Sequence, residues 1–143
     1  MPISIGVLAA RTGARVQTIR YYEQIGLMPE PDRTQGGQRR YDAAHVKRLA
    51  FIRHARALGF SLQQIRTLLE LADDPQRDCT GADSIAREHL RDVKARIKAL
   101  QSLKKELTRM VETCDGASVS QCRVIETLAD HSLCATPRHR PLS

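Results

Sequence analysis

The sequence has no long hydrophobic run, and this absence sets the first limits on its function. Its apolar stretch at residues 3–10 is short, follows no basic segment and runs into Arg11, so it fits neither a membrane helix nor a secretory signal. The chain is therefore expected to be cytoplasmic. Because thiols stay reduced there, we predict that its cysteines bind metal or sense redox state and do not form a structural disulfide.

Catalytic motifs are also missing from the sequence. It contains no phosphate-binding loop, no acid pair and no activated nucleophile, so we do not expect an enzyme. It also lacks the C-x2-C spacing that iron–sulfur sites and disulfide-forming sensors usually need. A thiol redox-sensing regulator therefore remains only as an alternative.

Positive charge is abundant, and it is concentrated near the start of the chain. The 143 residues include 41% hydrophobic and 27% charged residues, a composition that is typical of a soluble folded protein. The formal net charge of +7 indicates a polyanionic partner. Residues 1–60 hold nine arginines and one lysine against four acidic residues. Since arginine makes forked contacts with phosphates and guanine edges, this segment is predicted to bind nucleic acid.

The same basic segment has the pattern of a helix-turn-helix. A first helix is expected at residues 4–11 with Ser4 as its N-cap, followed by a break at Gly13 and a second helix at residues 16–24. The second helix of such a unit enters the major groove of DNA. Side chains of the second helix that can donate hydrogen bonds to DNA are those of Thr18, Arg20, Tyr21 and Tyr22. Consecutive helix positions point about 100° apart, so we expect one tyrosine to pack in the core while the other faces outward.

A basic hairpin and two further helices are predicted after the helix-turn-helix. Residues 29–41 contain two adjacent glycines followed by two arginines, which indicates a hairpin that could lie along the phosphate backbone as a wing. Helices are expected at residues 43–58 and from Ser61 to about residue 72. The expected fold class is mainly α, with a winged helix-turn-helix DNA-binding domain.

Residues 82–112 keep the spacing of a coiled-coil seam. Apolar residues recur in steps of three and four over about four heptads, with Lys104 as a break, and Leu103 and Met110 widen the stripe. The seam residues are Ala86, Leu90, Val93, Ile97, Leu100, Leu107 and Val111. A long helix with so narrow an apolar stripe is unstable alone in water. We therefore expect a partner helix, most simply from a second copy of the chain.

Cysteines bracket this long helix. Cys79 and Cys114 are 35 positions apart, which corresponds to roughly 50 Å along a helix, so their sulfurs cannot meet within one chain. They could meet between two chains if the helix pairs antiparallel with its copy. With Cys122 they would form a three-thiolate set suited to Zn, Cd, Pb or Hg, whereas two thiolates suffice for Cu(I). His131 and Cys134 are possible additional ligands.

Taken together, these features resemble those of the MerR family of regulators, in its heavy-metal-sensing branch. The resemblance covers about residues 3–128 and rests on the strings SIGVLAARTG, TIRYYEQIGL, GGQRRY and FIRHARALGFSL, on the heptad helix and on the C-x7-C loop. It implies a winged helix-turn-helix domain, an antiparallel dimerisation helix and a C-terminal metal-binding loop. The corresponding segments are residues 1–75 for the DNA-binding domain, 76–113 for the linker and dimerisation helix, 114–134 for the metal-binding loop and a short helix, and 135–143 for a flexible tail. We also expect the last residues of the third segment, from His131 onward, to share the mobility of this tail.

The resemblance also implies functional residues. Residues implied to contact DNA are Thr18, Arg20, Tyr21 and Tyr22 on the second helix, Arg33, Arg39 and Arg40 in the wing, and Arg56 in the next helix. In this branch, sensors of monovalent ions carry serine 35 positions before the first loop cysteine, and sensors of divalent ions carry cysteine, as Cys79 here. The implied metal site joins Cys79 of one chain to Cys114 and Cys122 of the other.

The implied function is a homodimeric regulator of a metal-resistance or efflux promoter. In this family the apo dimer represses on double-stranded promoter DNA, and metal binding distorts the DNA so that RNA polymerase can start. We therefore predict a divalent soft metal, Zn, Cd, Pb or Hg, as the effector. A Cu(I) or Ag(I) sensor of the same family is the nearest alternative, because the C-x7-C loop also suits that group.

Overall fold

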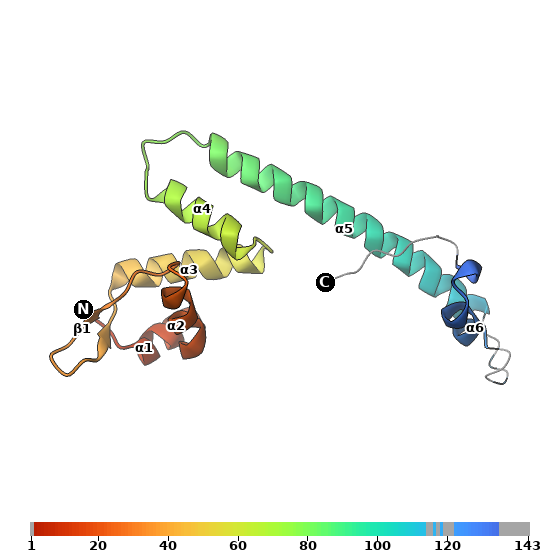
Figure 1. Ribbon diagram of the computed structural model, residues 1–143, viewed down its shortest axis with the longest axis horizontal. Coiled ribbons are helices and arrows are strands. Elements are labelled where there is room, and N and C mark those ends of the chain that lie inside the picture. The colour runs from red at the N-terminus through yellow and green to blue at the C-terminus, as the bar shows by residue number, and fades with distance from the viewer. Residues whose placement is uncertain (1, 114–115, 117, 119–121, 135–143) are drawn as a thin grey trace. The chain divides into compact units, whose positions relative to one another are not determined.

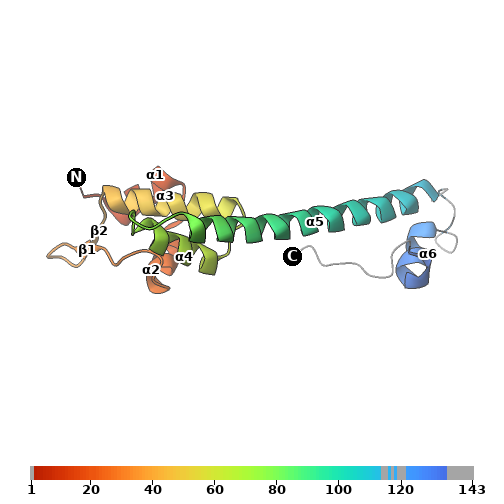
Figure 2. The same cartoon turned by 90° about the horizontal axis from the view of Figure 1, so that it is seen from above.

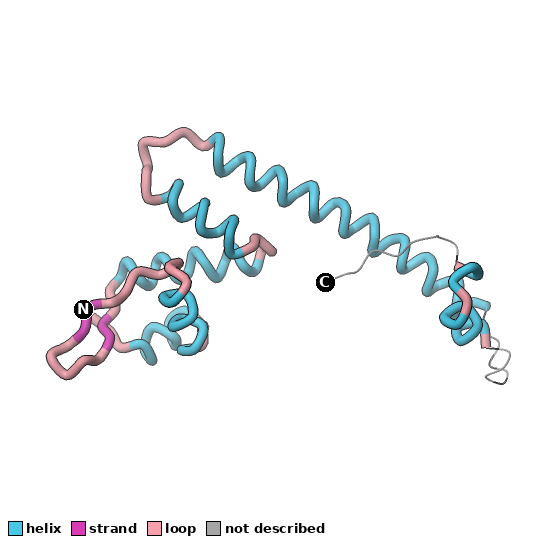
Figure 3. Tube along the Cα trace, in the orientation of Figure 1, coloured by secondary structure: helices cyan, strands magenta, loops and turns pink. Residues whose placement is uncertain are grey.

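The structure, a computed structural model, describes residues 2–113, 116, 118 and 122–134. Helices account for most of these residues, with one two-stranded sheet among them (Figure 3). The mainly α fold class predicted from the sequence is confirmed. The chain separates into two compact units, Met1–Ala82 and Asp83–Ser143, and each is described by itself.

Two short helices open the first unit. Helix α1 spans Ile5–Thr12; the Ser4 hydroxyl accepts a hydrogen bond from the Val7 N–H at its start, and Gly13 ends it with a φ of 75°. Such a left-handed φ favours glycine, which explains the abrupt turn. Helix α2 spans Val16–Gln24. Both helices begin and end within one residue of the predicted positions.

The predicted wing is a short antiparallel hairpin. Strand β1, Asp32–Arg33, pairs with strand β2, Arg39–Arg40, and the Gly37 φ of 83° allows the tight turn between them. An isolated bridge between Ile3 and Tyr41 continues the pairing beyond β2. Both views show the hairpin projecting from the end of the cluster formed by the first three helices (Figures 1 and 2).

Helices α3 and α4 complete the core of the first unit. Helix α3 spans Ala43–Ala57 and α4 spans Leu62–Ala72, and each begins with a capping box, from Asp42 and Ser61 respectively. Such boxes satisfy backbone N–H groups that the first turn of a helix leaves without partners. The largest fully buried side chains of this unit are those of Leu8, Ile19, Leu27, Met28, Tyr41, Leu49, Ile52 and Ile65.

Helix α5 is the longest element and runs over 34 residues, Thr80–Thr113. Most of its predicted seam is exposed in the single chain, including Leu90, Val93, Ile97, Leu100, Leu107 and Val111. A row of exposed apolar side chains is what a coiled-coil face offers to a second helix. Among the described residues, no helix is both long and apolar enough to cross a membrane.

A small C-terminal segment packs on the last turns of α5. Helix α6 spans Arg123–Ala129, and the 3-10 helix η2 spans His131–Leu133. Our expectation of a tail from His131 is therefore wrong for η2, while residues 135–143 lie outside the described residues. Met110, expected to widen the seam, is instead buried in this unit together with Thr127.

Candidate nucleic-acid interface and metal centre

Three arginines converge between α2 and the wing. Arg20 of α2, Arg33 of β1 and Arg39 of β2 together line two hollows of about 310 and 400 Å³. Side chains that complete the first hollow include Glu23, Gln24 and Glu30, and those that complete the second include Ser4 and Gln38. Three guanidinium groups from three elements give this surface the donors that recognise a phosphate backbone.

Two of the wing arginines are held in different ways. Arg33 Nη1 donates a hydrogen bond of 2.8 Å to the carbonyl oxygen of Gly37, which braces the turn of the hairpin. Arg39 is half-buried and pairs with Glu23, with 3.6 Å between Nε and Oε2. Arg40, the third wing arginine, is exposed. The wing therefore presents charge from a restrained backbone, which lowers the entropy lost on binding.

Helix α2 divides its predicted contacts between solvent and core. Arg20 is exposed, and Tyr21 is 48% exposed, whereas Tyr22 is only 8% exposed and packs in the core. Thr18 is half-buried. The two tyrosines thus differ in the way that their 100° separation predicts. The resemblance implies DNA contacts from both tyrosines, but the burial of Tyr22 leaves Tyr21 as the aromatic side chain of α2 that is accessible to a partner.

Arg56 lies at the end of α3 and is exposed. Its Nη1 donates a hydrogen bond of 2.8 Å to the Phe60 carbonyl oxygen. This bond satisfies a carbonyl just after the helix end and fixes the guanidinium at the surface. The remaining donors of Arg56 can still reach a phosphate.

Cys79 is an exposed free thiol directly before α5. The Asp78 carboxylate accepts a hydrogen bond of 3.0 Å from the Thr80 N–H, and this bond keeps the pKa of Asp78 below its usual range. The turn at the start of α5 is therefore locally ordered, and it presents the Cys79 thiol to solvent.

The second unit holds the other described thiols. Cys122 and Cys134 are both half-buried free cysteines, at the start of α6 and the end of η2. Burial, and then a hydrogen bond to the Glu106 carboxylate, raise the pKa of the Cys134 thiol. Cys114 lies outside the described residues.

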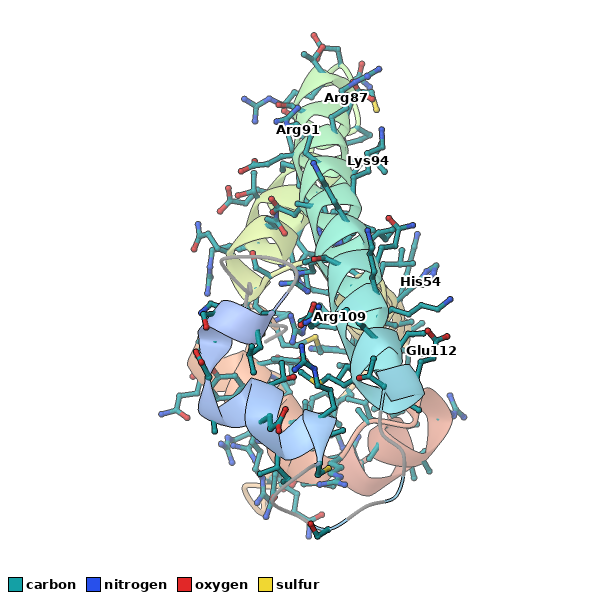
Figure 4. All side chains as sticks on the ribbon, turned by 90° about the vertical axis from the view of Figure 1, so that its right-hand side faces the viewer. His54, Arg87, Arg91, Lys94, Arg109 and Glu112 are labelled. Carbon is teal, nitrogen blue, oxygen red and sulfur yellow. The ribbon has the colours of Figure 1, made fainter. Side chains whose placement is uncertain are left out.

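Arg109 fastens the C-terminal segment to α5. Its Nη2 donates to the Leu133 carbonyl oxygen and lies 3.5 Å from Glu106 Oε1. Figure 4 shows Arg109 between α5 and the α6–η2 segment, while Arg87, Arg91 and Lys94 project from the first half of the helix. Neither Glu106 nor Arg109 was predicted from the sequence to have a role. Their only sequence signal is a charged pair three positions apart, which is common on exposed helices.

No group of three or more His, Cys, Asp or Glu side chains in the described part of the chain is placed to hold a metal ion. Cys79 belongs to the first unit, whereas Cys122 and Cys134 belong to the second. A soft metal prefers several thiolate ligands. The described thiols have the chemistry that such an ion requires.

Comparison with known proteins decides the family. The protein family described as "MerR HTH family regulatory protein" matches residues 3–72, and the family described as "MerR, DNA binding" matches residues 46–110. The chain is 43% identical over 127 residues to the HTH-type transcriptional regulator ZntR of Escherichia coli K12, covering 87% of this chain and 90% of that protein. The chain belongs to the MerR family. It is accordingly a DNA-binding transcriptional regulator, and the resemblance drawn from its sequence strings is confirmed.

Solved MerR-family structures agree with the fold. The regulator PbrR691 from Ralstonia metallidurans CH34, in complex with lead(II), superposes with a TM-score of 0.78 at 37% identity, covering 88% of this chain and 98% of that one. MerR from Bacillus megaterium MB1, in complex with mercury(II), gives a TM-score of 0.69 at 31% identity, covering 90% and 100%. The match therefore extends beyond the DNA-binding domain into α5 and the C-terminal segment.

Proposed function

We propose that this MerR-family chain is a homodimeric, metal-responsive regulator that represses a promoter without metal and activates it when a divalent soft metal ion binds. The observation that carries the proposal is the position of the cysteines at the two ends of α5. Cys79 directly precedes Thr80–Thr113, and Cys114 directly follows it. The two ends of a 34-residue helix are about 50 Å apart, so one chain cannot close this site.

An antiparallel dimer removes that separation. The exposed apolar side chains of α5 need a partner helix, and an antiparallel copy would bring the start of one α5 beside the end of the other. Cys79 of each protomer would then lie near the partner's Cys114 and Cys122. A closed dimer of this kind has two equivalent sites because the interface is symmetric.

The donor set favours a divalent soft ion. Three thiolates suit Zn, Cd, Pb or Hg, and His131 or Cys134 would be the candidates for a fourth ligand. The lead(II) and mercury(II) complexes of the two similar structures support an effector of this class. A Cu(I) or Ag(I) sensor is the weaker alternative, because two thiolates already satisfy such ions.

On DNA, two copies of α2 would read the half-sites of a near-palindromic operator in the major groove. We propose that Thr18, Arg20 and Tyr21 make contacts there. Phosphate contacts would come from Arg33, Arg39, Arg40 and Arg56. Metal binding must favour the activating conformation over the repressing one, since equal affinity for both would shift nothing. The activating state distorts the promoter so that RNA polymerase can use it.

Run-off transcription with RNA polymerase tests this proposal. The template is a promoter fragment identified by the footprint of the purified protein, and Zn, Cd, Pb, Hg, Cu(I) and Ag(I) are added in thiol buffer. Wild-type protein should respond to at least one divalent ion, and Cys79→Ser should lose that response while its operator affinity stays within about threefold. Ser84→Ala changes an exposed side chain near the start of α5 that belongs to no proposed ligand set, so it should keep the response. A response to Cu(I) alone, or an unchanged response of Cys79→Ser, would overturn the proposed site.

A further inference from the structure

Glu23 is a buried acid beneath the basic surface that faces DNA. It lies on α2, its side chain is only 7% exposed, and it lines the same hollow as Arg20, Arg33 and Arg39. A carboxylate so close to the DNA-binding arginines should repel phosphates, and burying it requires compensating partners. Solubility or surface charge therefore does not explain why an acidic residue occupies this buried position.

Two side chains from the wing satisfy this carboxylate. The Tyr41 hydroxyl donates a hydrogen bond of 2.5 Å to Glu23 Oε1, and Arg39 Nε lies 3.6 Å from Oε2. Burial, followed by the bond to Glu23, raises the pKa of Tyr41 above its usual range, so the phenol stays a donor. Glu23 therefore links α2 to Arg39 in β2 and to Tyr41, the residue directly after β2.

Tyr41 is itself rigidly held. It is 1% exposed, its backbone exchanges two hydrogen bonds with Ile3 at 2.7 and 2.8 Å, and its ring meets the His45 ring edge-on with 5.2 Å between centroids. The Glu23 carboxylate is therefore fixed by a side chain that cannot move independently of the core. Because Tyr41 fixes one oxygen of the Glu23 carboxylate, the other oxygen, Oε2, is also held in place for its own partner.

That oxygen faces Arg39. Arg39 is 28% exposed at its side chain, and its Nε is buried without a hydrogen-bond partner among the described residues. The Nε of Arg39 thus lies at ion-pair distance from Glu23, while Arg39 also lines both hollows that it shares with Arg20 and Arg33. The pair restrains Arg39 without using all of its donors.

We propose that Glu23 is a positioning residue for DNA binding, which sets Arg39 of the wing in place for a phosphate contact before DNA arrives. An arginine ordered in advance loses less side-chain entropy on binding, which corresponds to about 2- to 10-fold in affinity. This gain outweighs the repulsion of a buried acid whose charge is already paired. The inference rests on the DNA-binding role of the chain and not on its metal response.

The test compares charge removal at two acids of one hollow. Glu23→Gln keeps an acceptor for Tyr41 and removes the charge that holds Arg39, whereas Glu30→Gln removes a charge from an exposed acid that has no ion pair in the described structure. Binding is measured by fluorescence anisotropy, with chelator present, on a duplex selected from a random pool by the wild-type protein and on an unrelated duplex of equal length. Circular dichroism and the urea midpoint confirm that each variant is folded.

Glu23→Gln should bind the selected duplex about 2- to 10-fold more weakly, and its slope of log K against log salt should fall in magnitude by up to about 0.9, the value of one phosphate contact. Glu30→Gln should bind both duplexes at least as tightly as wild type, with an unchanged slope. Arg39→Lys keeps the charge but lacks the Nε group, so it should match Glu23→Gln. In an Arg39→Ala background, Glu23→Gln should change affinity less than about 1.5-fold.

Contrary results are equally specific. If Glu23→Gln binds the selected duplex as tightly as wild type or more tightly, the carboxylate acts only as a repulsive charge and the proposal is overturned. It is also overturned if the loss persists in the Arg39→Ala background, since Glu23 would then act through another group. If the wild-type protein selected no duplex at all, the DNA-binding assignment itself would fail, which differs from either result.

Discussion

The Arg66 guanidinium of α4 donates a hydrogen bond of 2.5 Å to the carbonyl oxygen of Ile25, the C-cap residue directly after α2. Carbonyls at the end of a helix have no partner within the helix, so this contact replaces a missing bond. Arg48 of α3 acts in the same way on the next turn, where its Nε donates to the Leu27 carbonyl oxygen at 2.8 Å and its Nη1 pairs with Asp73. Part of the arginine excess thus braces the C-terminal end of α2 and the turn that follows it.

Arg66→Ala should destabilise the first unit. It removes a charge-assisted hydrogen bond and leaves the half-buried Ile25 carbonyl without its donor, which corresponds to a loss of about 1.5–3 kcal/mol in the free energy of unfolding. Urea denaturation followed by circular dichroism measures the loss. Arg77→Ala, which truncates an exposed arginine, is the control and should shift the midpoint little. Equal midpoints for the two variants would show that the Arg66 contact contributes nothing.

Local signals explain how much of this structure the sequence predicted. Ser4, Gly13 and Ser61 act within one helical turn of their positions, so their residue types alone predict where α1 ends and where α4 begins. The bond between Glu23 and Tyr41 joins residues 18 positions apart and depends on how the wing folds back. No local pattern encodes that return, so in the sequence alone Glu23 is one acidic residue among many arginines.

The proposed site was predictable for a different reason. The separation of Cys79 from the loop cysteines could be converted to a length because the helix between them has a constant rise. The structure bears out the helix, Thr80–Thr113, and the exposed seam. What a single chain lacks is the partner that would gather the thiols, so the ligand set stays a proposal. The contact of Arg109 with the η2 backbone had no sequence pattern at all.

Stability should fall at high pH through Tyr41. Its pKa is raised in the folded protein, first by burial and then by Glu23. The unfolded phenol loses its proton above about pH 10 while the folded one keeps it. The stabilisation is therefore complete below that pH and decreases as the pH rises. Urea midpoints should decline above about pH 10, and Tyr41→Phe, although less stable at neutral pH, should decline less steeply. Tyr21→Phe, which removes an exposed phenol, should keep the wild-type decline.

Ile97→Glu should separate the dimer. Ile97 lies in the middle of the seam and is 49% exposed in the single chain, so an antiparallel pair would bury two charges near the centre of its interface. Sedimentation velocity should show a monomer, and affinity for a two-half-site operator should fall at least about 100-fold, because each half-site would bind alone. Lys98→Glu makes a larger change of charge at the adjacent exposed position and should remain a dimer. A dimeric Ile97→Glu protein would place the interface elsewhere.

Mixed dimers test whether the metal site joins two chains. One chain carries Cys79→Ser, and the other carries Cys114→Ser with Cys122→Ser. Each homodimer lacks a complete three-thiolate set. In the mixed dimer, Cys79 of the second chain would face the intact loop of the first, so one complete site returns while the opposite site loses all three thiols. The expected result is binding of one Cd ion per mixed dimer, seen by thiolate-to-metal absorption, and recovery of part of the transcriptional response.

The opposite geometry gives the opposite result. If each site were formed within a single chain, neither member of the mixed dimer would hold all three thiols, and mixing would restore nothing. Two affinity tags and sequential purification isolate the mixed dimer from both homodimers, and a mixed dimer of wild-type and Cys79→Ser chains sets the signal of one intact site. Because the mixed pair and this reference differ only in the loop thiols of the already incomplete site, equal Cd stoichiometry in the two would assign the surviving site to Cys79 of one chain and the loop of its partner.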